Sequence, residues 1–169
     1  SFYRPSSCRL ITGDVLPLLK ESWDLVIAHP PCTYLTNAGG PARAKDPSRR
    51  DLMEKGLRFF EACQKANSSR VCVENPKPFR EVTARVGPPT QVVCPSMFGE
   101  RFSKKTFLWL KGLPALIPTN QVEATKGTFG MRLPPSRLRG RLRSITSHGV
   151  AKAMASQWGG DVLKPDDAE

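Results

Sequence analysis

The chain is short of histidine, of acidic side chains and of long apolar runs. It has 2 histidines and 15 aspartates and glutamates in 169 residues, and its cysteines include no Cys-x-x-Cys pair. An odd number of scattered cysteines predicts neither a disulfide framework nor, with so few histidines, a zinc site. No stretch approaches the roughly 18 apolar residues of a membrane span. We therefore expect no metal site, no membrane span and free thiols in an intracellular, reducing compartment. The cysteines are Cys8, Cys32, Cys63, Cys72 and Cys94.

Length and termini bound the domain organisation. A chain near this length buries roughly 70% of its unfolded surface, which is enough for one core, so residues 1–169 are expected to form a single domain. The first residue is Ser1 and no signal or transit segment is visible. Such a start is what a processed chain or a fragment shows.

Basic charge is abundant and uneven. Lysine and arginine total 26, the net charge is +11, and residues 132–143 carry five arginines and no acid. Pro134, Pro135 and Gly140 prevent one continuous helix there, so we expect a basic, Pro- and Arg-rich loop at residues 112–146. Nucleic acid is the expected partner, with the arginines on its phosphates. The alternatives are a solubilising surface, or pairing of the arginines with the acids near the C-terminus or with a protein partner. The arginines are Arg132, Arg137, Arg139, Arg141 and Arg143.

Apolar runs and helical spacing predict an α/β fold. Strands are expected at residues 8–15, 23–28, 70–75 and 105–110, and the middle two are nearly continuous apolar runs, as in strands covered on both faces. Residues 46–66 predict a helix with Asp46 as N-cap and Pro47 in its first position. A strand, a crossover helix and a second strand form a right-handed βαβ unit, which implies a parallel sheet.

Two more helices are expected, at residues 77–87 and 147–159. The second has Ser147 as N-cap and Val150, Met154 and Trp158 on one face, which should dock on the sheet. Residues 38–50, 87–101 and 112–143 are rich in glycine and proline and predict loops.

Polar or reactive side chains follow three of the expected strands. Asp14, then His29 to Cys32, then Glu74 and Asn75 each come at a strand end, and ligands of open α/β sheets bind at the carboxyl ends of strands. We expect these groups to converge. The alternative is structural: two prolines end a strand, Cys32 is a small buried apolar side chain, and Asn75 caps a helix.

A thiol beside a carboxylate suits chemistry on a heterocyclic base. The thiolate of Cys32 could add to an electron-poor ring carbon while Glu74 hydrogen-bonds the ring nitrogen that gains electron density.

Five stretches, in this order, carry a resemblance: "GDV", "DLVIAHPPCTYLT", "VCVENP", "FGERFSKKTFLWLKGLP" and "RSITSHGVAKAMASQWG". Together they resemble the small DNA cytosine-C5 methyltransferase-like proteins of bacteriophage genomes, over about residues 11–159. The resemblance implies an incomplete Rossmann-like fold of the class I methyltransferase type, with a mostly parallel sheet and flanking helices. It also implies DNA modification by methyl transfer from S-adenosylmethionine to C5 of a flipped cytosine.

By that resemblance Cys32 is the nucleophile that attacks C6, and Pro31 shapes its loop. Glu74 holds the base at N3 and the exocyclic amine, and Asn75 orders the cysteine loop.

The same resemblance assigns residues to the cofactor pocket and to the nucleic acid. Asp14 matches the acid that contacts the adenine of S-adenosylmethionine, with His29, Gly149 and Ala151 in the cofactor pocket. The nucleic-acid contacts are Lys104 and Thr106, on a basic strand that faces the base and its phosphates.

The chain also departs from that family. Its members begin with a strand and a glycine-rich turn for the cofactor, whereas "SFYRPSSCRL" has no glycine. Either that segment is missing or half of the cofactor site is lost, so this chain is expected to bind S-adenosylmethionine weakly or not at all. Separate target recognition is left to the loop at 112–143.

Two alternatives stay open. One is a catalytically degenerate subunit with a structural or RNA-binding role in a large assembly, such as an organellar ribosome or respiratory complex, located in an organelle matrix rather than a phage host's cytoplasm. The other is an amino-group methyltransferase, since "HPPC" is similar to the Asn-Pro-Pro-aromatic turn of adenine methylases. There His29 would replace the Asn and Cys32 the aromatic, and Tyr34 lies too far along to substitute simply.

Overall fold

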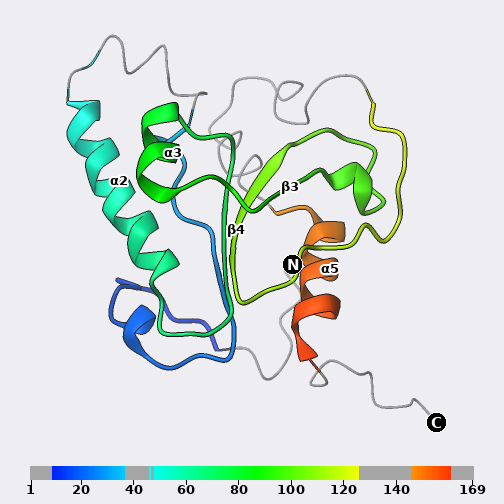
Figure 1. Ribbon diagram of the computed structural model, residues 1–169, viewed down its shortest axis with the longest axis horizontal. Coiled ribbons are helices and arrows are strands. Elements are labelled where there is room, and N and C mark those ends of the chain that lie inside the picture. The colour runs from blue at the N-terminus through cyan, green and yellow to red at the C-terminus, as the bar shows by residue number, and fades with distance from the viewer. Residues whose placement is uncertain (1–8, 37–45, 47, 126–145, 161–169) are drawn as a thin grey trace.

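The computed structural model describes residues 9–36, 46, 48–125 and 146–160, and these form a four-stranded sheet with helices on both faces (Figure 1). The strand order is β1-β2-β4-β3. The strands are β1 (Val26–Ala28), β2 (Val71–Asn75), β3 (Gln91–Val93) and β4 (Thr106–Lys111). The expected α/β class is confirmed.

The directions of the strands correct the expectation of a mostly parallel sheet. β1 runs parallel to β2, but β4 runs antiparallel to both β2 and β3, so the sheet is mixed. The crossover helix between β1 and β2 returns the chain to the same starting edge, which makes that pair parallel. β3 leads into β4 through residues 94–105 without a crossover helix, and such a connection joins antiparallel neighbours.

Two segments differ from their expected structure. The described residues 9–15 form no strand and lead into a 3-10 turn, η1 (Leu18–Lys20). Residues 87–101, expected as a loop, contain β3 and a second 3-10 turn, η3 (Pro95–Met97). A three-residue strand is too short to give a periodic signal, whereas residues 9–15 have no neighbouring strand to pair with in the described sheet.

The predicted crossover helix is α2 (Arg49–Gln64), and the predicted second helix is α3 (Arg80–Val86). The N-cap of α2 is Ser48 and not Asp46, because the Asp46 carboxylate accepts hydrogen bonds from the backbone and hydroxyl of Ser48 (3.0 and 2.6 Å) and so forms the turn before the helix. Pro47 lies outside the described residues. Both helices cover one face of the sheet, where Phe60 packs edge-on against Trp109 at 5.0 Å between ring centroids.

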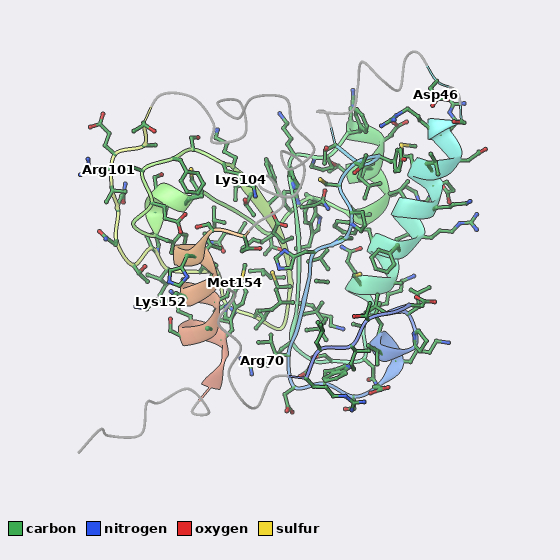
Figure 2. The ribbon with its side chains drawn as sticks, turned by 180° about the vertical axis from the view of Figure 1, so that it is seen from behind. Asp46, Arg70, Arg101, Lys104, Lys152 and Met154 are labelled. Carbon is green, nitrogen blue, oxygen red and sulfur yellow. The ribbon has the colours of Figure 1, made fainter. Side chains whose placement is uncertain are left out.

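The last helix, α5 (His148–Trp158), covers the opposite face. Its predicted N-cap is confirmed, since the Ser147 side chain accepts from the backbone of Val150, and the predicted buried face of Val150, Met154 and Trp158 is confirmed as well. Figure 2 shows Met154 between α5 and the sheet, with Lys152 on the outer side of the helix. This face holds a second core with Cys72 and Leu108 of the central strands.

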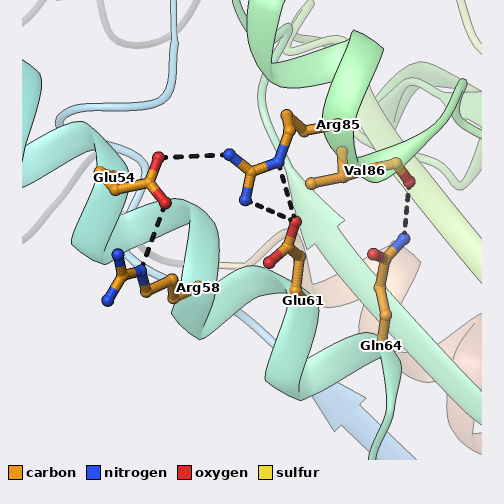
Figure 3. A network of polar contacts seen from close by, with 6 residues as sticks. All are labelled: Glu54, Arg58, Glu61, Gln64, Arg85 and Val86. Atoms are coloured by element: carbon orange, nitrogen blue, oxygen red, sulfur yellow. Dashed lines mark hydrogen bonds and ion pairs between the residues drawn. The ribbon is translucent and has the colours of Figure 1, made fainter.

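A polar network holds α3 on α2 (Figure 3). Arg85 contacts Glu54 at 3.2 Å and Glu61 at 2.9 Å, and Arg58 contacts Glu54 at 3.3 Å. Hydrogen bonds from Arg58 and then Arg85 lower the pKa of Glu54. Since these ion pairs are exposed, they contribute little stability, and only the pairs of Arg85 join the two helices.

The three layers decide which way each residue of β2 points. Val71 and Val73 lie in the core under α2, and Cys72 lies in the core under α5. Because side chains alternate along a strand, Glu74 faces the α5 side and Asn75 the α2 side. Among the described residues, none of the helices combines the length and the apolar character needed to cross a membrane.

Candidate functional site

The carboxyl ends of β1 and β2 bring His29 and Glu74 together. The parallel register pairs Ala28 with Val73, so the next residue of each strand lies beside the other. The His29 ring and the Glu74 carboxylate are hydrogen-bonded, with Nδ1 3.1 Å from Oε2. The Glu74 side chain is 16% exposed and that of His29 is 41% exposed. Two of the expected site residues therefore meet at this edge, and His29, expected in a cofactor pocket, contacts the catalytic candidate.

Asn75 fastens the Pro-Pro turn to β2 from the other face of the sheet. Its side-chain Nδ2 donates to the carbonyl oxygen of Pro30 at 3.0 Å, and the residue is 1% exposed. Its Oδ1 is buried, and within the described part of the chain it has no hydrogen-bond partner. A buried unpaired acceptor costs about 1–3 kcal/mol. The amide of Asn75 therefore holds the turn through its Nδ2 donor, while its unpaired Oδ1 lowers the stability of the fold.

Cys32 lies in a turn that is held from both sides. Its carbonyl oxygen accepts from the backbone of Leu35 (3.0 Å) and from the hydroxyl of Thr36 (3.1 Å), and the backbone of Phe79 donates to Leu35 (2.9 Å). Pro31 is exposed and Cys32 is half-buried. The structural alternative of a fully buried Cys32 is therefore wrong.

The other thiols on the central layers differ from Cys32. Cys63 and Cys72 are 2% and 0% exposed. Burial raises the pKa of Cys63 to about 11 and that of Cys72 to about 12, with the Glu74 charge adding to the second. These two thiols stay protonated at neutral pH, whereas Cys32 lies at the sheet edge with access to solvent.

A small pocket adjoins Glu74 on the α5 side. The pocket is partly open to solvent, and its volume of about 20 Å³ is enough for a water molecule. It is lined by Glu74, Lys104, Thr106, Thr146, Ser147, Val150 and Met154. Figure 2 shows Lys104 at the same end of the sheet, above Met154. The two described nucleic-acid candidates, Lys104 and Thr106, thus share a pocket with Glu74, and a base could reach them only from the open side.

The amino end of α5 is already occupied by a carboxylate of the chain itself. Glu100 Oε1 accepts hydrogen bonds from the backbone of Gly149 (2.6 Å) and from the Ser147 hydroxyl (2.9 Å). A Cβ at Gly149 would overlap the carbonyl oxygen of Phe98, so glycine is needed there for close packing. Ala151 is exposed. The two α5 residues expected in a cofactor pocket therefore lie at a closed helix end and on an outer surface.

Asp14 is not brought to the site. Its carboxylate accepts from the backbone of Leu16 at 3.0 Å, and the segment that follows is tied to Asn67, whose backbone donates to Leu19 and accepts from Trp23. Asn67 lies just before β2, at the end opposite Glu74. Because residues 9–15 form no strand, nothing carries Asp14 to the carboxyl edge.

Cys94 is a second half-buried thiol at this edge, which the sequence analysis did not single out. It follows β3 at the same edge, since Val93 pairs with Thr106, and its Sγ lies 3.9 Å from the Ser103 hydroxyl oxygen. Burial opposes its ionisation, but hydrogen bonds from Ser96, the Lys104 backbone and Ser103 outweigh burial and lower the pKa of the thiol. The signal available was a cysteine directly after two β-branched residues, Val92 and Val93.

The remaining candidates lie outside the described residues, namely Arg132, Arg137, Arg139, Arg141 and Arg143. In the described part of the chain, no group of three or more His, Cys, Asp or Glu side chains is placed to hold a metal ion. Comparison of the chain with protein-family models, with curated proteins and with solved structures finds no match.

Proposed function

We propose that this chain is a DNA cytosine-C5 methyltransferase-like protein that adds Cys32 to C6 of an unpaired cytosine held by Glu74. The observation that carries the proposal is the pair of contacts that joins the Pro-Pro-Cys turn to the end of β2: Asn75 to Pro30 and His29 to Glu74. They support a thiol and a carboxylate working at one sheet edge, which is what addition to a pyrimidine ring needs.

The residues of the chain account for the first half of such a reaction. The Cys32 thiolate forms a C–S bond at C6, the C5–C6 double bond breaks, and its electrons move toward N3. Glu74 supplies the proton that N3 takes up and accepts a hydrogen bond from the exocyclic amine. His29 holds the carboxylate in position through its hydrogen bond.

Without a methyl donor the adduct reverses. C5 first takes a proton from water, then gives up a proton, and the thiolate leaves as N3 returns its proton to Glu74. The net result is exchange of the C5 hydrogen with solvent.

S-adenosylmethionine is the donor implied by the family, and the residues expected to hold it do not form a site among the described residues. Asp14 lies near the opposite end of the strands, and Glu100 fills the amino end of α5. No methyl-transfer step is therefore assigned to these residues. Calorimetric titration of this 169-residue chain with S-adenosylmethionine is expected to give no micromolar binding, and a micromolar isotherm would contradict that expectation.

Solvent exchange tests the chemistry apart from the cofactor. A single-stranded oligonucleotide with tritium at C5 of its cytosine is incubated with the protein, and tritium release into water is counted. We expect release with the wild type, none with Cys32→Ser, and wild-type release with the matched control Cys94→Ser. Equal release by wild type and Cys32→Ser, or none by either, would contradict the proposed function.

The degenerate, RNA-binding alternative is favoured by one observation, the closed amino end of α5. It predicts RNA binding with no tritium release. The exchange assay therefore separates the two functions.

A further inference from the structure

We propose that a basic strip beside the Cys32 turn binds the phosphates that flank the target base, on the α2 side of the sheet edge. The strip consists of Tyr34, Arg49, Lys77 and Arg80 and is called here the Tyr34 strip. It rests on the proposed function, since it names where the nucleic-acid strand lies relative to Cys32.

The centre of the Tyr34 strip is a stacked pair. The guanidinium carbon of Arg49, the first residue of α2, lies 4.7 Å from the centroid of the Tyr34 ring. Tyr34 is two residues from Cys32 and packs against the core under α2. Stacking on an anchored ring holds the planar guanidinium in place while its N–H edge stays available for a bidentate phosphate contact.

Backbone pairing brings the other two cations alongside. Thr36 forms an antiparallel bridge with Pro78, and the Phe79 backbone donates to Leu35 at 2.9 Å. Lys77 and Arg80 flank this bridged segment and are exposed. Figure 1 shows the amino ends of α2 and α3 at the end of the molecule where β2 finishes. The bridge therefore places three cations around one turn.

The cations of the Tyr34 strip differ from the neighbouring arginines in their ion pairing. Arg58 and Arg85 are paired with Glu54 and Glu61. In the described ranges, no carboxylate forms an ion pair with Arg49, Lys77 or Arg80.

Asp46 lies in the turn before α2, where its carbonyl oxygen accepts from the Arg49 backbone at 3.2 Å. Two further acids lie near the strip, Asp51 and Glu81. They occupy the first turns of α2 and α3, where they complement the positive helix ends. The strip is therefore a site that suits an anion.

The position of the strip favours a nucleic-acid strand as that anion. Glu74 and the Lys104 pocket lie on the α5 side of the edge, whereas Asn75 holds the Cys32 turn at Pro30 from the α2 side, where the Tyr34 strip also lies. A strand that presents one base to Cys32 would cross this edge and leave its flanking phosphates on both sides. A cationic surface with regularly spaced phosphates as its partner releases counterions on binding, so its affinity depends on salt.

The test measures binding and not catalysis. Fluorescence anisotropy with a labelled single-stranded DNA oligonucleotide containing one cytosine is recorded over a range of salt for wild type and for the triple variant Arg49→Ala, Lys77→Ala, Arg80→Ala. Loss of three phosphate contacts should reduce the slope of log K against log salt by about 2, at roughly 0.7 per phosphate for single strands. Arg58→Ala, on the paired outer face of α2, is the matched control and should keep the wild-type slope.

Arg49→Lys covers the case in which the triple variant does not fold, as checked by circular dichroism. It keeps the charge but not the planar fork, so its affinity should fall while its slope stays near that of the wild type.

Several results would overturn the inference: a wild-type slope in the folded triple variant, wild-type affinity in folded Arg49→Lys, no DNA binding by the wild type, or polyglutamate competing as well as DNA, which would indicate an acidic protein partner. A reduced slope in the triple variant, together with no tritium release by the wild type, would contradict the proposed chemistry but still support phosphate binding by the Tyr34 strip.

Discussion

Replacement of Asn75 tests whether the amide that joins β2 to the Pro-Pro turn is what positions Cys32. Asn75→Ala removes the amide that donates to the carbonyl oxygen of Pro30. Pro30 is buried, so its carbonyl is left unpaired at a cost of about 1–3 kcal/mol. The lost side-chain volume at a 1% exposed site adds a cavity cost, while removal of the unpaired Oδ1 returns part of the energy. We expect a net loss of about 2 kcal/mol in the free energy of unfolding.

Asn75→Asp is the more informative partner of that variant. It keeps the shape of the side chain but sets an oxygen against the Pro30 carbonyl and buries a charge, so it should destabilise the fold by more than the alanine does. Urea unfolding measures both. With a slope of about 2 kcal/mol per molar urea, Asn75→Ala should lower the midpoint by about 1 M. The rate of Cys32 alkylation in the native state, read by peptide mass spectrometry, should change in both variants because the turn is released.

An Asn75→Ala protein that unfolds within about 0.5 kcal/mol of wild type, with an unchanged alkylation rate at Cys32, would refute the reasoning. The control is Asn67→Ala. Asn67 also donates through its side-chain Nδ2, to Lys20 at 3.1 Å, but it is exposed and lies at the opposite end of the strands. This variant should leave the Cys32 rate unchanged.

Three further predictions follow from packing and from the thiols. Gly149→Ala should lower the free energy of unfolding in urea by about 2 kcal/mol or more, because its Cβ would overlap the Phe98 carbonyl. The control Ala151→Ser, on the exposed side of α5, should leave the stability unchanged. An unchanged stability in Gly149→Ala would contradict the close packing. The raised pKa values of Cys63 and Cys72 mean that the folded state keeps thiol protons that the unfolded state gives up. The contribution of these thiols to the free energy of unfolding is therefore fully present below about pH 9. It falls as pH rises from there toward 11–12, by about 1.4 kcal/mol per pH unit for each thiol. Urea unfolding at pH 8 and pH 10 should show a smaller fall in Cys72→Ala than in wild type, and an equal fall would contradict the assignment. Cys94 should be alkylated faster than Cys63 and Cys72 near neutral pH. Ser96→Ala should slow the alkylation of Cys94, because loss of the hydrogen bond raises the pKa of its thiol. An unchanged pH profile of the alkylation rate in Ser96→Ala would show that Ser96 does not set the pKa of Cys94.

Local patterns predicted the parts of the fold that each segment decides for itself. The spacing of Met53, Leu57 and Phe60 and the apolar run of β2 are enough to predict a strand-helix-strand unit, because both signals are read within one segment. Ser147 is likewise an N-cap by its own sequence neighbours. The meeting of His29 with Glu74 follows once the two strands are taken as parallel.

Other features depend on partners distant in sequence. The alternation along β4 is the same whichever way the strand runs, so its antiparallel direction cannot be read from residues 106–111. The contact between Glu100 and the amino end of α5 joins residues 49 positions apart, and neither side carries a local signal for it. The expectation that Asp14 lies at this edge depends on a strand at residues 8–15, and the described residues 9–15 form none.

The candidate site depends on two adjacent residues that serve opposite faces of one strand. Glu74 points to the α5 side, where it meets His29 and the Lys104 pocket, and Asn75 points to the α2 side, where it holds Pro30. Because the period of a strand is two, a slip of one residue in the pairing of β1 with β2 would exchange these roles and bury the carboxylate among apolar side chains. The Val71 and Val73 positions in the α2 core make such a slip costly, since it would also turn both valines toward α5. The packing of the central strand therefore holds the carboxylate and the thiol turn in the same register, and any variant that loosens this core should disturb Glu74 and Cys32 together.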